Sequence, residues 1–413
     1  MRYVVGTGAE AAAPAVGVVG GGQLARMMQE PAAALGIQLH ALVEALDGAA
    51  GQVIPHARLG EADDAPGVLQ LTQDVDVITV EHEHVPEQIL AQAATRVPVR
   101  PGPHALRFAQ DKLAMRQRMD ELGVPQPRWR NVASTADVAR GLEEFGGVGV
   151  LKMPRDGYDG KGVMLIRDAD DAQAWLTEAP GGLLLEEHIA FQMEVAQLLA
   201  RRPSGEVRCW PLVQTVQKGG ICTEVIAPAP GIGDAVARQA QQVGERIAAE
   251  LDVTGILAVE MFVARGEDGN LRPYVNELAM RPHNSGHWTI EGAVTSQFEQ
   301  HLRAVLDLPL GSAQPRAPYA VMVNVLGSAL EDPRRAYARV MAEYPQVKIH
   351  IYGKAVRPGR KLGHVTVLGE SAPEALAMAR GAVAMLQGDD GIAPGADTAT
   401  TGAAVRPERD ASQ

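Results

Sequence analysis

The sequence predicts an α/β protein, and three glycine-containing turns carry this prediction. The apolar run 16–19 leads through three glycines into a helical pattern, which is how a Rossmann-like domain begins. Two short apolar runs, 148–151 and 163–166, flank a glycine-rich link and predict a hairpin. Two longer runs, 255–264 and 271–278, flank an Asp-Gly pair and predict a second hairpin.

Composition limits the classes of function. A chain of 413 residues is long enough for two to three domains. Its net charge of −12 and its 4% of aromatic residues argue against a nucleic-acid partner. Two cysteines, Cys209 and Cys222, are typical of reduced structural thiols. No apolar run is long enough for a bilayer and no signal peptide is evident, so we expect a cytoplasmic protein without a membrane partner.

The first glycine turn has the spacing of a dinucleotide fingerprint. Gly20, Gly22 and Ala25 fit G-x-G-x-x-A, and Glu44 ends the following strand near the place of a ribose-binding acid. Any strand–glycine–helix turn presents N–H groups that suit a phosphate. The turn therefore indicates a nicotinamide dinucleotide or a phosphate monoester, and we favour the monoester.

A second strand, 75–80, ends in four alternating glutamates and histidines at 81–84. A metal cluster is one interpretation. The other is a ligand-binding strand end at the carboxyl edge of a parallel sheet. Neighbouring residues of an extended segment point in opposite directions, so all four side chains cannot face one ion. We favour the second interpretation, with one of the two glutamates binding a hydroxyl group.

The segment 104–122 has a charged amphipathic pattern and predicts one helix. The Gly-Val-Pro sequence at 123–125 is a helix stop, and we place the end of the first domain near it.

The hairpin tip 152–162 carries two lysines and glycines, which suits a mobile flap over phosphates or an ordinary solvated turn. It lacks the Ser or Thr of a Walker A loop. Residues 183–189 leave a strand and offer backbone groups to a nucleobase, or simply connect domains.

The second hairpin predicts a metal site. If Asp268-Gly269 is the centre of the turn, Glu260 lies directly opposite Glu277, with the two side chains on one face. Two bare carboxylates would repel each other, and a divalent cation removes that cost. Mg²⁺ accepts such ligands together with phosphate oxygens, and Asn276 offers another oxygen. The alternative is two surface acids.

Two later segments are dense in polar or cationic residues. The loop after the second hairpin resembles a substrate loop and contains Arg281, His283, Asn284 and Ser285. The segment 354–364 indicates a pocket for a phosphate or carboxylate, or a solvated turn, and contains Lys354, Arg357, Arg360 and Lys361.

Together these motifs resemble the N5-carboxyaminoimidazole ribonucleotide synthetase family of ATP-grasp enzymes, the ATPase subunits of phosphoribosylaminoimidazole carboxylase. The matching stretches cover about 16–385 and read GGGQLARM (20–27), VITVEHEHVP (77–86), GYDGKG (157–162), VEMFV (259–263), NELAMRPHNSGHW (276–288), SQFEQHLRA (296–304) and RPGRKLGH (357–364). The resemblance implies a Rossmann-like pre-ATP-grasp domain over 16–122, a small ATP-grasp domain over 123–192 and a large one over 193–387. Disordered ends are expected at 1–15 and 388–413.

The resemblance also implies roles for single residues. The nucleotide would contact Lys112, Lys152, Gly157, Tyr158, Asp159, Gly160, Lys161, Gly162, Val163, Glu186, Glu187, His188, Ile189, Glu194, Gln217, Asn276 and Glu277. Mg²⁺, or Mn²⁺ as an alternative, would lie between Glu260 and Glu277. The ribonucleotide would contact Gly22, Gln23, Leu24, Glu81, Ser285, Arg357, Arg360 and Lys361, and the reacting centre would hold Tyr158, Asp159, Arg281, His283, Asn284 and Lys354.

The implied reaction is ATP-dependent carboxylation of 5-aminoimidazole ribonucleotide by bicarbonate, through carboxyphosphate, in purine synthesis. ADP and phosphate are released, and Asp159 would orient the amine. A homodimer is the family expectation. The chain departs from the family pattern at Met280, at Gln217 and in the 81–84 segment.

Three alternatives remain. Formate-dependent glycinamide ribonucleotide transformylase shares the fold, but there Arg-Pro-His is typically followed by Asp-Thr-Gly, whereas this chain has Asn284, Ser285 and Gly286. A nicotinamide oxidoreductase would explain the first turn and leave the Glu260/Glu277 pair unexplained. A catalytically silent nucleotide-binding protein would keep its properties after Asp159→Asn.

Overall fold

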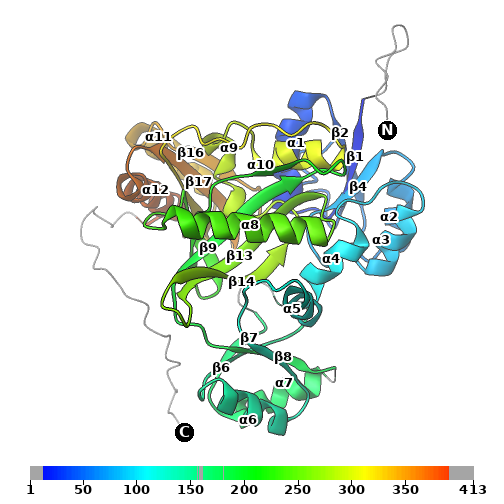
Figure 1. Cartoon of the computed structure of the whole chain (residues 1–413). Coiled ribbons are helices and arrows are strands. Elements are labelled where there is room, and N and C mark those ends of the chain that lie inside the picture. The colour runs from blue at the N-terminus through cyan, green and yellow to red at the C-terminus, as the bar shows by residue number, and fades with distance from the viewer. Residues whose placement is uncertain (1–12, 156, 158–160, 180, 390–413) are drawn as a thin grey trace, which may run out of the picture.

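Three β-sheets surround a central site in the computed structural model, which describes residues 13–155, 157, 161–179 and 181–389 (Figure 1). The predicted extension 1–15 and tail 388–413 fall almost entirely outside the described residues, and so do Tyr158, Asp159 and Gly160. The predicted α/β class is confirmed, with one parallel and two antiparallel sheets. None of the described helices is long and apolar enough to cross a membrane.

The N-terminal sheet is parallel, four-stranded and ordered β3-β2-β1-β4, as the strand–turn–helix pattern predicts. Its helix α1 begins directly after the glycine turn and passes through Pro31 as one helix. Its strands are β1 (Ala15–Val19), β2 (Gln38–Val43), β3 (His56–Leu59) and β4 (Val77–Val80), and its helices are α1 (Gln23–Leu35), α2 (Ala65–Leu71) and α3 (Glu87–Ala94).

The single helix expected over 104–122 is wrong, because two helices, α4 (Pro103–Gln110) and α5 (Lys112–Glu121), meet at Asp111. Asp111 has an extended φ of −130°, and its carboxylate caps α5 by accepting the N–H groups of Leu113 and Ala114. The N–H of Lys112 donates to the carbonyl of Pro154 at 2.9 Å. The break therefore joins the start of α5 to the base of the glycine-rich hairpin.

The small antiparallel sheet has the order β5-β8-β6-β7 and lies at the bottom of Figure 1 with α6 and α7. The predicted glycine-rich hairpin is confirmed as β6 paired with β7, and Lys152 is opposite Val163. Its elements are β5 (Trp129–Val132), α6 (Thr135–Glu144), β6 (Gly149–Lys152), β7 (Val163–Ile166), η1 (Ala169–Ala172), α7 (Gln173–Glu178) and β8 (Leu183–Glu187).

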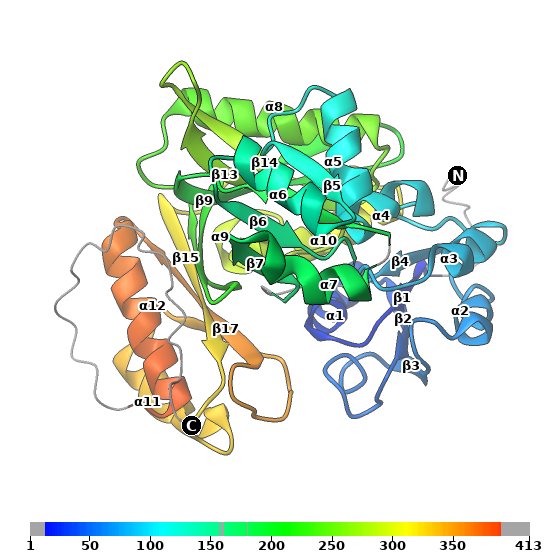
Figure 2. The ribbon, with the colours of Figure 1, turned by 90° about the horizontal axis from the view of Figure 1, so that it is seen from below.

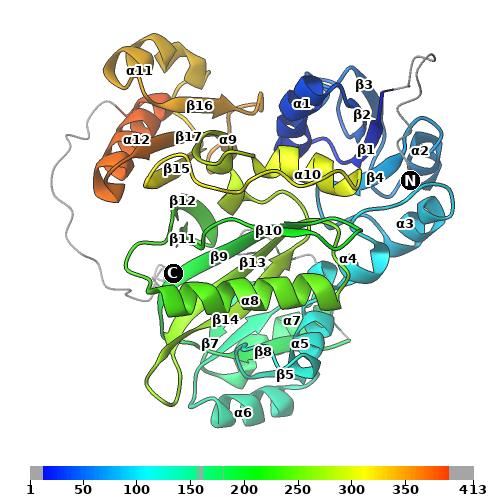
Figure 3. The same ribbon diagram turned by 45° about the horizontal axis from the view of Figure 1, so that its top comes forward.

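The large sheet has nine strands in the order β14-β13-β9-β11-β12-β15-β17-β16, with β10 paired to β9. The helix α8 crosses in front of β9 and β13 in Figure 3. Its strands are β9 (Phe191–Arg201), β10 (Val207–Cys209), β11 (Val213–Lys218), β12 (Ile221–Ala227), β13 (Gly255–Arg265), β14 (Leu271–Ala279), β15 (Tyr319–Leu326), β16 (Lys348–Ile351) and β17 (Lys361–Gly369). Its helices are α8 (Asp234–Glu250), η2 (Asn284–Gly286), α9 (Thr289–Gly292), α10 (Gln297–Val305), η3 (Pro333–Ala336), α11 (Tyr337–Glu343) and α12 (Ala372–Gln387).

A shared core fixes the N-terminal sheet to the large sheet. Leu24 and Met28 of α1 belong to one buried cluster with Phe298 and Leu302 of α10. The ring of His301 adds a polar link, because its Nε2 lies 2.8 Å from the hydroxyl of Thr79 on β4. The loops at the carboxyl edge of the N-terminal sheet therefore face the large sheet (Figure 2). The domain boundaries expected from the sequence stay a prediction.

Candidate active site

A pocket of about 1260 Å³ lies where the three sheets meet. Most of the site residues predicted from the sequence line this pocket, although they come from segments spread over more than 300 positions of the chain. They are Gly22, Gln23, Leu24, Glu81, Lys112, Lys152, Gly157, Val163, Glu186, Glu187, His188, Ile189, Glu194, Gln217, Glu260, Asn276, Glu277, Arg281, His283, Asn284, Lys354, Arg357, Arg360 and Lys361.

Ser285 does not line the pocket, and its predicted contact with substrate stays a prediction. Its side chain is fully buried, and its hydroxyl lies 2.8 Å from Nδ1 of His283. Ser285 therefore helps to fix the position of the His283 ring. Lys161 and Gly162 lie outside the lining as well. Tyr158, Asp159 and Gly160 belong to the residues that the structure does not describe.

The predicted pairing of Glu260 with Glu277 is confirmed, although the predicted turn is not. The turn is a three-residue loop over 267–269, closed by the N–H of Gly266 on the carbonyl of Asn270, with Gly269 at a φ of +77°. A β-bulge between Met261 and Glu260 then shifts the register by one residue. The bulge leaves Asn276 unpaired and puts both carboxylates on one face.

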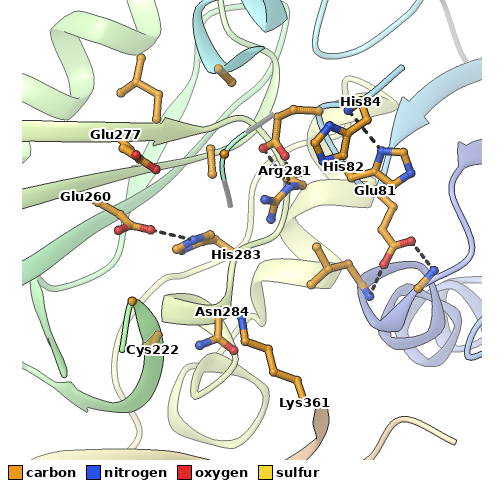
Figure 4. Close-up of a pocket in the computed structure, with 18 of the residues that line it drawn as sticks. Glu81, His82, His84, Cys222, Glu260, Glu277, Arg281, His283, Asn284 and Lys361 are labelled. Carbon is orange, nitrogen blue, oxygen red and sulfur yellow. Dashed lines mark hydrogen bonds and ion pairs between the residues drawn. The ribbon is translucent and has the colours of Figure 1, made fainter. Parts of the chain in front are cut away.

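Glu260 is held by a histidine. Its carboxylate lies 3.0 Å from Nε2 of His283, and Figure 4 shows this contact at the centre of the site. Burial raises the pKa of Glu260, but the hydrogen bond from His283 and the charges of His283, Arg281 and Lys361 outweigh it, so the net pKa is lowered. The carboxylate is therefore charged and available as a ligand.

The acids on this face fit a divalent cation that also has ligands from a substrate. Glu194 on β9 adds a third carboxylate, and burial together with the charge of Glu260 raises its pKa to about 7. Crowding of this kind is relieved by a cation. Among the described residues no cluster of three or more His, Cys, Asp or Glu side chains is arranged to hold a metal alone. That agrees with Mg²⁺, which usually completes its shell with phosphate oxygens and water.

Two lysines face the acids from the small domain and from α5. Nζ of Lys112 lies 3.7 Å from the carboxylate of Glu277 and 3.5 Å from the carbonyl of Gly157. Nζ of Lys152 lies 2.9 Å from the side-chain oxygen of Asn276 and 2.9 Å from Glu186. Both ammonium groups can therefore reach an anion placed above the paired carboxylates.

The side chain of Glu186 is committed to a buried ion-pair network. Arg116 donates to it at 2.6 Å and also donates to the carbonyls of Val275 and Asn276. Burial alone would raise the pKa of Glu186, but Arg116 and Lys152 lower it to about 2. A nucleotide can therefore use only backbone groups at this residue. Arg116 was missed by sequence reasoning, because nothing local distinguishes it from the other cations of a charged helix.

The loop 281–287 is held in place by one neighbour from the N-terminal domain and one from another strand of the large sheet. Arg281 is paired with Glu83 at 2.8 Å, a contact that links the loop after β4 to the large domain. The side-chain oxygen of Asn284 accepts a hydrogen bond from Asn324 at 3.1 Å. Glu83 was one of the two glutamates considered from the sequence, but its pairing with Arg281 was not predicted.

The glycine turn of the N-terminal sheet is already occupied by two acids of the chain. Glu81 accepts the N–H groups of Gly22 and Leu24 (Figure 4). Glu44 accepts the N–H of Gly21 at 3.1 Å. A Cβ added at Gly22 would lie 2.2 Å from an oxygen of Glu81. The turn therefore presents these N–H groups neither to the pyrophosphate of a nicotinamide dinucleotide nor to the phosphate monoester favoured from the sequence, and both interpretations lose their main support.

His82 and His84 line the pocket beside this turn. Nε2 of His82 lies 3.7 Å from Glu44. Burial lowers the pKa of His82, but Glu44, Glu81 and Glu83 together outweigh it, so the net pKa is raised. The 81–84 segment is thus a strand end with ion pairs, and the hydroxyl-binding role favoured from the sequence stays a prediction.

The cationic segment closes the other side of the pocket. Lys354 donates to the side-chain oxygen of Gln23, and Gln52 donates to the carbonyl of Gly353 at 2.9 Å. These contacts bind the segment to the N-terminal domain. Lys361 projects toward Asn284 in Figure 4, and both residues belong to the large-sheet wall of the pocket.

An aromatic pair is the clearest feature that sequence reasoning missed. Phe191 and Phe262 stack with ring centroids 4.7 Å apart, and both line the pocket. Phe191 remains 44% exposed. Their registers on β9 and β13 could have been derived only from the strand pairing, which no local motif specifies.

Comparison with known families covers most of the chain. A family model described as the ribonucleotide synthetase preATP-grasp domain matches residues 14–110. The ATP-grasp domain matches residues 117–298. The phosphoribosylaminoimidazole carboxylase C-terminal domain matches residues 320–378.

Several relatives and solved structures share a name. N5-carboxyaminoimidazole ribonucleotide synthase of Mycobacterium tuberculosis is 47% identical over 364 residues, covering 86% of this chain and 84% of the relative. The crystal structure of the Thermus thermophilus synthetase has a TM-score of 0.80 at 39% identity, covering 90% of this chain and 98% of that one. The crystal structure of an Aspergillus clavatus synthase in complex with ADP and 5-aminoimidazole ribonucleotide has a TM-score of 0.81 at 34% identity. It covers 91% of this chain and 98% of that one. This chain therefore belongs to the N5-carboxyaminoimidazole ribonucleotide synthase family of ATP-grasp enzymes.

Proposed function

We infer that this enzyme carboxylates 5-aminoimidazole ribonucleotide with ATP and bicarbonate, giving N5-carboxyaminoimidazole ribonucleotide, ADP and phosphate. One observation carries the inference beyond family membership. A single pocket joins the acids and lysines suited to a nucleotide triphosphate to a cationic segment suited to a second phosphate. The two anionic substrates would therefore meet inside one cavity.

On the ATP side, Lys112 and Lys152 would neutralise the phosphates. Residues 186–189 would offer backbone groups to the base, and the Phe191/Phe262 pair would provide an apolar wall. Glu260 and Glu277 would hold Mg²⁺, which supplies charge neutralisation for phosphoryl transfer. Gln217 and Glu194 would contact the nucleotide from the neighbouring strands.

On the other side, Glu81 and the Gly22–Leu24 turn that holds it would contact a hydroxyl group of the ribonucleotide, and Arg357, Arg360 and Lys361 would bind its phosphate. In the first step a bicarbonate oxygen attacks the γ-phosphorus of ATP, and ADP leaves. The amine then attacks the carbonyl carbon of carboxyphosphate, or CO₂ released from it. Phosphate leaves, and the amine loses one proton.

Arg281, His283 and Asn284 would orient bicarbonate and the transferring phosphoryl group, since all three line the pocket beside Glu260. Tyr158, Asp159 and Lys354 would complete this centre, with Asp159 orienting the amine. A homodimer and a cytoplasmic location are further expectations from the resemblance.

The test is phosphate release from Mg-ATP and bicarbonate, measured with and without 5-aminoimidazole ribonucleotide. Strong stimulation by the ribonucleotide is expected. Folded protein that shows no stimulation would overturn the assignment. The same assay with formate and glycinamide ribonucleotide then tests the transformylase alternative.

A further inference from the structure

The side-chain amide of Gln297, at the start of α10, has a fixed orientation. Its oxygen accepts the backbone N–H of His283 at 2.8 Å, and its nitrogen donates to the carbonyl of the same residue at 2.8 Å. Backbone groups have only one hydrogen-bonding role each, so the amide cannot be reversed. Gln297 is fully buried, and a Cβ at Gly286 would lie 2.3 Å from its oxygen.

This orientation determines the tautomer of His287. The amide nitrogen of Gln297 lies 2.9 Å from Nδ1 of His287, and its second hydrogen is available for this contact. An amide nitrogen does not accept hydrogen bonds, so Nδ1 of His287 must be the acceptor. In a neutral ring the proton then resides on Nε2.

The ring of His287 is held rigidly and stays neutral. It stacks on Phe298 and lies against His364 and Tyr352, with centroid distances of 5.7, 5.0 and 6.4 Å. Burial and the nearby positive charges lower the pKa of His287 well below its ordinary value. The residue is 1% exposed, yet it lines the pocket.

We propose that His287 uses its Nε2–H to bind an anionic oxygen of a substrate, and that Gln297 is the positioning residue that fixes this donor. The ligand is a phosphate or carboxylate oxygen, because the cationic side chains of Lys361 and Arg281 line the same pocket as the ring. A neutral imidazole donor is not lost as the pH rises, unlike an imidazolium. The substrate assignment rests on the proposed function, whereas the tautomer does not.

The tautomer is tested first, by ¹⁵N NMR of the full chain labelled at histidine. The signals of His287 are those lost in His287→Phe. We expect the Nε2–H tautomer in the wild type and its loss in Gln297→Glu, whose carboxylate cannot donate to Nδ1. A wild-type ring protonated on Nδ1, or on both nitrogens at neutral pH, would overturn the proposal.

Steady-state kinetics test the ligand. His287→Phe keeps the stacked ring and removes the donor. We therefore expect KM for either the ribonucleotide or bicarbonate to rise about tenfold, with KM for ATP unchanged. A rise for the ribonucleotide identifies its phosphate as the ligand, and a rise for bicarbonate identifies a carboxylate. His287→Gln, which keeps an N–H near the position of Nε2, should recover most of the loss.

If KM for both substrates is unchanged in His287→Phe, the proposal is wrong. If the wild type has no carboxylase activity at all, the proposed function fails by itself. In that case inorganic phosphate is added to the labelled protein as a ligand in the NMR experiment. A shift of the His287 Nε2–H signal on adding phosphate supports the donor role, and no shift refutes it.

Discussion

Glu260 on β13 lies directly opposite Glu277 on β14, and this pairing depends on one extra residue in β14. Nearer the turn, Phe262 faces Tyr274, and that register continued would put Asn276 opposite Glu260. Glu277 would then point to the other face of the sheet, because side chains alternate along a strand. The bulge thus brings two acids together, with His283 beside one and Lys112 beside the other.

Glu260→Gln and Glu277→Gln should each lower turnover by about 100-fold, because each removes a fixed charge from the phosphoryl-transfer site. The Mg²⁺ concentration that gives half-maximal phosphate release should rise in both. Glu267→Gln is the matched control, since Glu267 is an exposed acid in the loop of the same hairpin. An unchanged Mg²⁺ requirement in both site variants would contradict the metal assignment.

Arg116→Met should destabilise the protein by about 3–5 kcal/mol, because it leaves the buried carboxylate of Glu186 with one partner fewer. Urea unfolding gives the change in free energy. Arg118→Met on the same helix is the control, since its ion pairs with Glu121 and Glu250 are partly exposed and should contribute less than about 1 kcal/mol. Equal losses of unfolding free energy in the two variants would show that the buried network stabilises the protein no more than the exposed ion pairs do.

Local sequence patterns predicted much of this architecture. Both hairpins and the parallel sheet are confirmed, since glycine turns and alternating apolar runs are local signals. The break at Asp111 was missed because a helix pattern continues through it, while a capping carboxylate decides the geometry. The turn of the second hairpin was also placed wrongly, and the pairing of Glu260 came out right because the bulge compensates.

Contacts between distant segments were the harder part of the site. Gln297 holding His283 and His287, and Arg116 holding Glu186, are side-chain contacts across different elements. No spacing in the sequence encodes them. Ser285 shows that a polar residue in such a loop can also support a neighbour, because its hydroxyl lies against the ring of His283.

Glu194→Gln should flatten the pH dependence of stability. The pKa of Glu194 is raised from 4.5 to about 7, so the folded state binds this proton more tightly than the unfolded state. Glu194 therefore adds to the free energy of unfolding at pH values below its pKa in the unfolded state. This stabilisation is lost as the pH rises through its pKa in the folded state. The Tm of the wild type should therefore fall more than that of the variant between about pH 5 and about pH 8. Parallel Tm curves for the two proteins would mean that Glu194 ionises normally.

Gly22→Ala should weaken ribonucleotide binding without unfolding the chain. The added methyl group would overlap with Glu81, whose carboxylate must then leave the N–H groups of Gly22 and Leu24. Because Glu81 and this turn belong to the proposed ribonucleotide site, we expect KM for the ribonucleotide to rise about tenfold, with KM for ATP unchanged.

The matched control is Gly233→Ala. Gly233 is also an extended N-cap glycine, at the start of α8, but an added Cβ there meets no atom within 4 Å. This variant should therefore keep both KM values and stay within about 0.5 kcal/mol of the wild-type stability. If Gly22→Ala matched Gly233→Ala in every measurement, the contact between Glu81 and the turn would have no part in ribonucleotide binding, and the ribonucleotide would have to be held by the cationic segment alone.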